Sequence, residues 1–235
     1  MPKSLRIKPQ KPGESHANYA YRNLRGNIME FVLLPGEQLD EQELSEALEI
    51  SRTPVHEAML RLREERLVNI VPRRESRVAY IDLSLATEGA FMRYAVEPVL
   101  IKSIAGSLPA EDLEKLLENL DTQRKILEEN VELYRFYPVD DAFHELIYRA
   151  ANKKEVFQAV KKVVSHLDRM RYLVRFEGGF EIEAMSFQEH KMILNMLTFG
   201  ITPEMDLAAF YKQHVLRFQL GAHDLVEKYS SYFGR

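Results

Sequence analysis

The chain has 235 residues, of which 46% are hydrophobic and 29% are charged, and its formal net charge is −4. These values are typical of a globular protein with one large domain or two of ordinary size, and they exclude a disordered chain. No run of about 18 apolar residues is present, so we expect no transmembrane helix and no membrane association.

The N-terminal sequence MPKSLRIKPQKPG lacks the apolar segment of a secretory signal. The absence of cysteine excludes cysteine-ligated metals and fits a reducing cytosol, so we expect a cytoplasmic protein. The negative charge lies mainly beyond residue 80, and seven arginines stand between Ile50 and Tyr80. Because salt screens charges beyond roughly 8 Å, the acidic total does not exclude binding to DNA.

The first 16 residues carry basic side chains and prolines with little to bury, which predicts a flexible basic N-terminal arm. Contact of this arm with DNA phosphates is the alternative. Apolar residues then recur at helical spacing from Ala17 to Val32, and Leu34-Pro35-Gly36 ends that helix.

Asp40 is predicted to cap a second helix and Ser51 a third, with Pro54 tolerated in the first turn of the third helix. The third helix has an apolar stripe of Val55, Ala58, Met59 and Leu62. Its first turns carry Arg52, Thr53 and His56, which suit a groove lined by phosphates and base edges. The segment VNIVPRRESRVAYI alternates around a polar turn and predicts a hairpin. Residues 17–81 therefore predict a winged helix-turn-helix, with a small helical domain bearing a solvated arginine face as the alternative.

The run PGEQLDEQELSEALEISRTPVHEAMLRL resembles the DNA-binding domain of the GntR family of bacterial transcription regulators. The resemblance implies a homodimer on a palindromic double-stranded operator, and a wing that reaches the minor groove. It also implies base and phosphate contacts from Arg52 and Thr53. The full set of predicted DNA-contacting residues is Gln42, Ser51, Arg52, Thr53, His56 and Arg74.

Three positions depart from the family pattern. Arginine is usual where His56 stands and frequent where Gln42 stands, and Glu75 follows Arg74 where the wing usually carries Arg-Gly. Histidine has fewer donors than arginine, and a carboxylate at the wing tip faces a negative duplex. We expect DNA binding with a changed operator preference.

Residues 82–235 show only helical periodicity and predict an all-α bundle for effector binding and dimerisation. The expected helices span residues 85–105, 109–130, 138–151, 155–176, 181–199 and 203–229. The whole chain is therefore expected to be mostly α.

Asp140 and His144 stand four residues apart and share a helix face, and His190 and His214 lie on two later helices. These four side chains could meet inside a bundle and hold a divalent transition metal, with Zn, Ni, Fe or Mn left open. On spacing alone, Asp-x-x-x-His is more often a surface pair. His166, with Arg169 and Arg171, is expected in the core or on the surface.

The C-terminal part resembles the FCD ligand-binding domain of the FadR-type branch of GntR regulators. The resemblance implies that Asp140, His144, His190 and His214 ligate the metal and that a small carboxylate is the effector. Arg93 matches an arginine that faces the family's pocket, although a surface pair with Glu97 is an equal alternative. The interval between the last two histidines implies an insertion near residues 200–203.

Two functions compete at this point: a regulator whose operator affinity depends on a metabolite, and a helical metalloenzyme that uses the Asp/His cluster. The segment HELIY lacks the second histidine of a zincin helix, and no G-x-S-x-G, Walker or G-x-G-x-x-G motif is present. A metalloenzyme would also leave the DNA-binding domain unexplained. The regulator is favoured, and no catalytic residue is assigned.

Overall fold

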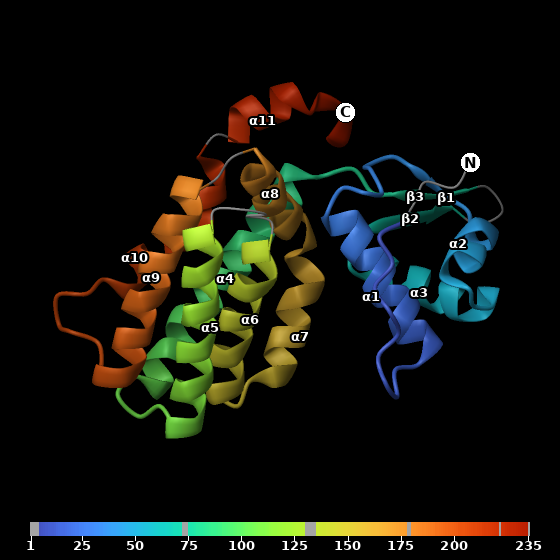
Figure 1. The fold of residues 1–235 in the computed structure, drawn as a ribbon. Helices are drawn as coiled ribbons and strands as arrows, with labels where there is room; N and C mark the ends of the chain where they lie inside the picture. Colours follow the sequence, from blue (N-terminus) through green and yellow to red (C-terminus); the bar gives the residue numbers. More distant parts are fainter. Residues whose placement is uncertain (1–4, 72–74, 130–134, 178–179, 221, 235) are drawn as a thin grey trace.

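The computed structural model describes residues 5–71, 75–129, 135–177, 180–220 and 222–234. Figure 1 shows a small N-terminal domain of helices and a sheet beside a larger bundle of helices, joined by the segment between β3 and α4. Within the described residues, none of the helices has the length and apolarity needed to cross a lipid bilayer.

The N-terminal domain contains three helices and a three-stranded antiparallel sheet. The helices are α1 (His16–Met29), α2 (Glu41–Leu48) and α3 (Arg52–Glu64), and the strands are β1 (Gln38–Leu39), β2 (Val68–Val71) and β3 (Glu75–Val78). The strand order is β1-β3-β2, with Val68 opposite Val78 and Gln38 opposite Arg77. This confirms the predicted winged helix-turn-helix and adds β1, which is too short to show a period.

Backbone geometry fixes the turn between α2 and α3. Asp40 accepts hydrogen bonds from the N–H groups of Gln42 and Glu43, as its predicted capping role requires. Glu49 ends α2 in the left-handed conformation, with φ of 56°. Ser51 occupies the capping position of α3, but its side chain makes no capping hydrogen bond, contrary to the prediction.

Gly36 connects the first helix to the sheet with a φ of +78°. A Cβ at this position would lie 2.5 Å from the hydroxyl oxygen of Tyr80. Glycine is therefore required both by the backbone conformation and by the close approach of Tyr80.

The C-terminal domain is helical throughout its described residues. Its helices are α4 (Leu83–Ile104), α5 (Ala110–Glu129), α6 (Phe136–Ala150), α7 (Lys154–Val163), α8 (Ser165–Phe176), α9 (Phe180–Phe199), α10 (Leu207–Leu216), η2 (Arg217–Gln219), α11 (Ala222–Lys228) and η3 (Ser230–Tyr232). Two predicted helices were wrong in extent: residues 155–176 form two helices, and residues 203–229 form three shorter elements. Apolar spacing does not distinguish one long helix from two that pack around a corner.

Part of the predicted flexible arm lies against α1. The backbone N–H groups of Arg6 and Lys8 donate to the side-chain oxygens of Asn27 and Asn23, each at 2.8 Å. The amide groups of the same asparagines donate back to the carbonyls of Arg6 and Lys8. Two buried asparagines of α1 thus hold this segment through hydrogen bonds to its backbone. The composition of the segment does not predict this contact.

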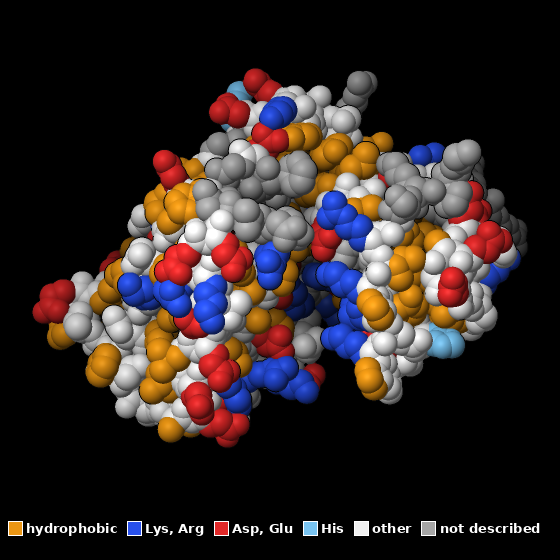
Figure 2. All heavy atoms as spheres, viewed as in Figure 1, with side chains coloured by type: hydrophobic (Ala, Val, Ile, Leu, Met, Phe, Trp, Pro, Cys, Tyr) orange, Lys and Arg blue, Asp and Glu red, His pale blue; other side chains and the backbone are white. Residues whose placement is uncertain are grey.

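The two domains meet mainly through α8. The Ser165 hydroxyl donates to the carbonyl of Glu65, and the Arg169 guanidinium donates to the carbonyl of Ala79 at 2.7 Å. His166 Nε2 lies 3.1 Å from the carbonyl oxygen of Arg66. Figure 2 shows Lys and Arg side chains on both sides of the hollow between the domains. Hydrogen bonds from α8 to backbone carbonyls of the N-terminal domain are therefore part of the contact between the two domains.

Candidate DNA-binding surface and metal centre

The third helix of the N-terminal domain divides into a buried and an exposed face. Val55, Ala58, Met59 and Leu62 are all 0% exposed, which matches the predicted apolar stripe. Ser51, Arg52, Thr53 and His56 are exposed at its N-terminal end. Gln42, Ser51 and Arg52 line one shallow depression between α2 and α3. Five of the six predicted DNA-contacting residues are thus exposed around the start of α3.

Acidic side chains modify this surface in ways that the sequence analysis missed. His56 Nδ1 lies 2.8 Å from the Glu41 carboxylate, and the Gln42 amide donates to Glu46. On the wing, Arg77 donates to both carboxylate oxygens of Glu75, each at 2.7 Å, and this pairing lowers the pKa of Glu75. Arg77 therefore offsets the negative charge at the wing. The sixth predicted residue, Arg74, lies outside the described residues.

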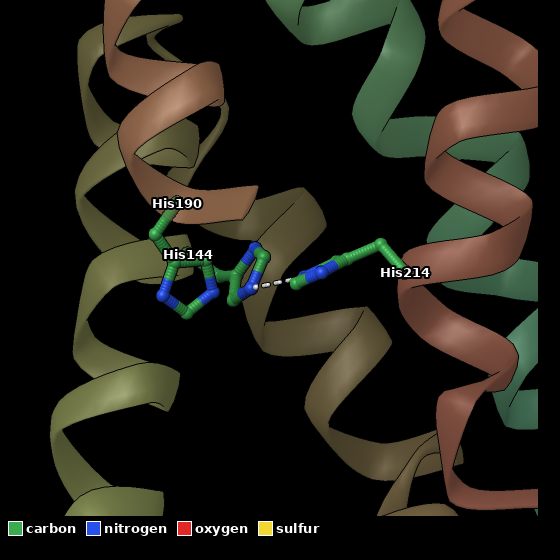
Figure 3. A group of neighbouring side chains, drawn as sticks. All are labelled: His144, His190 and His214. Atoms are coloured by element: carbon green, nitrogen blue, oxygen red, sulfur yellow. Dashed lines mark hydrogen bonds between the residues drawn. The ribbon is translucent and has the colours of Figure 1, made fainter. Parts of the chain in front are cut away.

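The three predicted histidines converge inside the helical bundle. His144 comes from α6, His190 from α9 and His214 from α10, and their ring centroids are 5.2 to 5.3 Å apart. One nitrogen from each ring lies within 4.8 Å of those from the other two. Figure 3 shows the rings turned toward one another. All three side chains are buried, so the expected cluster exists as a geometric unit.

Each imidazole has an acceptor on its outer side. His190 Nδ1 lies 2.8 Å from the Gln123 side-chain oxygen, His214 Nδ1 lies 2.6 Å from Glu189, and His144 Nδ1 lies 3.0 Å from Glu97. A hydrogen on Nδ1 of His190 and His214 leaves their Nε2 lone pairs directed to the centre, which is the usual arrangement of metal-ligating histidine. His144 Nδ1 is close to Glu97 but makes no hydrogen bond among the described residues, and its Nε2 lies 3.3 Å from the Nε2 of His214.

Burial also favours the neutral, ligating form of these rings. It lowers the pKa of His214 to about 4 and lowers the pKa of His144 and His190 as well. The Nε2 of His190 is buried with no hydrogen-bond partner among the described residues. A buried nitrogen without a hydrogen-bond partner costs free energy. The arrangement is therefore more typical of a metal-binding cluster than of histidines that only pack in a core.

Asp140 stands beside the cluster but is shared with a cation. One carboxylate oxygen lies 3.6 Å from His190 Nε2, and the other accepts a hydrogen bond from Arg171 on α8. Asp140 is fully buried, so its charge requires this partner. Asp140 is not one of the three groups whose atoms lie within 4.8 Å of one another, but one of its oxygens could coordinate a metal at the histidine cluster.

Arg93 forms the expected pair with Glu97, but the pair is buried rather than on the surface. The Arg93 Nε donates to Glu97 at 2.8 Å, and the two side chains are 7% and 2% exposed. Burial opposes ionisation of Glu97, but Arg93 and His144 outweigh it and keep its pKa below the usual range. Arg93 also lines a small pocket next to His214. The pair with Glu97 is therefore present but buried, and a role of Arg93 in effector binding stays a prediction.

The residues that support the cluster were not predicted from the sequence. Arg171 was left without a role, and Glu97, Gln123, Glu189 and Arg217 were not assigned to the site. Three weak signals were available: Glu97 lies four residues from Arg93, Glu189 precedes His190, and Arg217 lies three residues after His214. Gln123 and Arg171 have no such neighbour in the predicted cluster.

The two domains match two family models. Residues 16–78 match that of the bacterial regulatory proteins of the gntR family, and residues 88–200 match that of the FCD domain. The HTH-type transcriptional repressor RspR of Escherichia coli K12 is 33% identical over 153 residues, which are 65% of this chain and 67% of RspR. This chain belongs to the GntR family.

A second relative is similar in sequence, and two solved structures are similar in fold. An HTH-type transcriptional regulator in an unstable DNA locus of Streptomyces ambofaciens is 30% identical over 194 residues, 83% of this chain and 80% of that protein. The fold is similar to that of E. coli McbR/YncC, with a TM-score of 0.67 and 19% sequence identity. The match covers 92% of this chain and 99% of McbR/YncC. The structure of a GntR transcriptional regulator from Rhodococcus sp. RHA1 has a TM-score of 0.69 and 20% sequence identity. That match covers 92% of this chain and 100% of the Rhodococcus chain.

The chain is therefore a DNA-binding transcriptional regulator with an FCD domain, and the metalloenzyme alternative is set aside because the relatives are regulators.

Proposed function

We propose that a small carboxylate bound at a metal in the FCD domain controls the affinity of this GntR regulator for its operator. The observation that carries the proposal is the convergence of three buried imidazoles whose Nε2 atoms face one centre. Asp140, His144, His190 and His214 would hold a divalent metal, with Zn, Ni, Fe and Mn all compatible with imidazole and carboxylate ligands. The bound metal would supply positions for a carboxylate oxygen, and Arg93 would supply a nearby positive charge.

At the other end of the molecule, we propose that Gln42, Ser51, Arg52, Thr53 and His56 contact the operator, with Arg74 reaching it from the wing. The exposure of the first five around the N-terminus of α3 supports this assignment. The proposed assembly is a homodimer of the FadR type on a palindromic operator, because two-fold proteins match two-fold sites. A monomeric mass in light scattering at micromolar concentration would contradict the dimer.

Metal content tests the site directly. Protein purified without added metal should contain near one divalent ion per chain by elemental analysis, and the ion should raise the melting temperature by mass action. His190→Ala should lose both the ion and the stabilisation, because it removes a ligand from the buried cluster. His223→Ala is the matched control, because His223 is 84% exposed on α11 and should leave the metal content unchanged. Equal metal content in the two variants would disprove the site.

A further inference from the structure

We propose that this regulator has a second ligand site, between its two domains, which binds a small organic anion with an apolar body. The site is separate from the histidine cluster, because its lining contains none of the three histidines of that cluster. It therefore goes beyond the proposed function and does not depend on a bound metal.

A cavity of about 650 Å³ lies where the N-terminal domain, the linker and the helical bundle meet. Its walls come from the end of α3, β2, the start of α4, α8, α11 and the residues after η3. Figure 1 shows the C-terminus near the segment that joins β3 to α4, and the backbone N–H of Ile81 donates to the carbonyl of Tyr232 at 2.8 Å. Ligand sites commonly have volumes of roughly 300–1,000 Å³, so this cavity has room for a small organic molecule.

Much of the cavity wall is apolar. Its aliphatic and aromatic side chains come from both domains: Val68, Ala79, Ile81, Leu83, Leu85, Val226 and Phe233. Two large side chains of the wall, Tyr80 and Leu83, are 45% and 41% exposed. Removal of such surface from water is favourable, so the wall favours a ligand with an apolar body.

The same wall carries two arginines without an acidic partner. Arg63 and Arg66 line the cavity, and their side chains make no ion pair or hydrogen bond among the described residues. Asp82 is the one acidic residue of the described lining, and its carboxylate already accepts the N–H groups of Ser84 and Leu85 at the start of α4. The two guanidinium groups are therefore available to an anion, which they can bind through paired N–H donors.

A buried arginine behind this wall adds further positive charge. Arg169 is 0% exposed, and its Nη1 donates to the carbonyl of Ala79, which lines the cavity. Its Nε and Nη2 have no hydrogen-bond partner among the described residues, and burial lowers the pKa of Arg169 to about 9. Because a buried charge without compensation is costly, an anion in the cavity would stabilise the folded protein.

A ligand in this cavity would contact both domains at once. Arg63 and Val68 belong to the DNA-binding domain, whereas Leu85, His166 and Val226 belong to the bundle. Such a ligand binds this arrangement of the domains more tightly than one in which they separate. The site would therefore fix the placement of the DNA-binding domain and raise the melting temperature by mass action.

Fluorescence titration of the full-length protein with 8-anilinonaphthalene-1-sulfonate, an aromatic anion, tests the inference. We expect saturable binding, and octanoate should displace the probe at a tenfold or more lower concentration than octanamide, its neutral counterpart. The double variant Arg63→Gln/Arg66→Gln should bind the probe at least tenfold more weakly. Arg149→Gln is the matched control, because it removes an arginine that is 56% exposed on α6, away from the cavity.

A second variant repels the anion without removing an arginine. Leu83→Glu places a carboxylate on the cavity wall, and an acidic residue suits the first turn of α4, so the helix should stay folded. This variant should also weaken probe binding, and circular dichroism checks that each variant is folded.

Three results would overturn the inference. The first is equal probe binding by the native chain, the double variant and Leu83→Glu. The second is equal displacement by octanoate and octanamide, which would show that the charge of the ligand is not recognised. The third is loss of probe binding when a chelator removes bound metal, which would place the ligand at the histidine cluster. Absence of metal from the purified protein would contradict the proposed metal centre and leave the interdomain site standing.

Discussion

At the scale of single residues, each histidine of the buried cluster lies beside a partner that is far from it in the sequence. The spacing of Asp140 and His144 places both on one helix face, and the family resemblance added His190 and His214. Their orienting partners could not be predicted, since Gln123 is 67 residues from His190 in the chain. Only the packing of α5 against α9 brings these two residues together.

The contact between Glu41 and His56 leads to a prediction about which base the operator carries. Glu41 accepts from Nδ1, so the Nε2 of a neutral His56 is left as a hydrogen-bond acceptor on the exposed face of α3. Adenine and cytosine present amino donors in the major groove, whereas guanine presents two acceptors. His56→Arg should therefore move the selected base at the contacted position toward guanine, with about 1–3 kcal/mol of discrimination.

Selection from a random DNA library, followed by fluorescence anisotropy on the selected sites, measures this change. Arg52→Ala serves as the reference for lost binding, and circular dichroism checks that each variant is folded. Unchanged base preference and unchanged salt dependence in His56→Arg would show that position 56 does not reach the DNA.

At the scale of elements, the sequence predicted that the C-terminal domain is helical, but it did not predict where one helix ends and the next begins. Residues 155–176 have continuous apolar periodicity, but they form α7 and α8 with a corner at Val164. This corner packs on Gly89 of α4, where an added Cβ would lie 3.0 Å from the Val164 Cα and 3.2 Å from the Val163 oxygen. The corner depends on a contact more than 70 residues away in the chain, which local periodicity does not contain.

Gly89→Ala tests the importance of this close approach. Overpacking costs roughly 1–3 kcal/mol, and the better helix propensity of alanine offsets about 1 kcal/mol of it, so a net loss of stability is expected. Gly26→Ala in α1 is the matched control, because no atom outside its own helix lies within 4 Å of the new Cβ. That variant should gain about 0.5–1 kcal/mol. Thermal unfolding followed by circular dichroism should thus shift the two variants in opposite directions, and a stabilised Gly89→Ala would contradict the packing argument.

At the scale of the whole molecule, one helix touches both functional regions. Near its start, α8 contacts the DNA-binding domain through Ser165 and His166, and further along it holds Asp140 through Arg171. The sequence predicted two domains and their order from the change in periodicity. It did not predict how they dock, because the contacts of Ser165, His166 and Arg169 go to backbone carbonyls, which have no sequence signature.

His166 makes the docking sensitive to pH in a direction that can be tested. Its Nδ1 accepts the N–H of Asp82 at 3.0 Å and its Nε2 faces the carbonyl of Arg66, so only the neutral ring satisfies both contacts. Burial and the nearby Arg169 lower the pKa of His166 to about 4. Its pKa is lower in the folded state than in the unfolded state. The contribution of neutral His166 to the free energy of unfolding is therefore complete above about pH 6.5 and is lost as the pH falls toward 4. The loss is at most about 3 kcal/mol.

His166→Gln isolates this contribution, because glutamine retains one acceptor and one donor but does not titrate. Urea unfolding of metal-free protein should show a smaller loss of stability between pH 7.5 and 5.0 in the variant than in the native chain. The other buried histidines titrate in both proteins, so only the difference between the two reports His166. If native and variant chains lost the same free energy over this range, protonation of His166 would not be coupled to the docking of the DNA-binding domain.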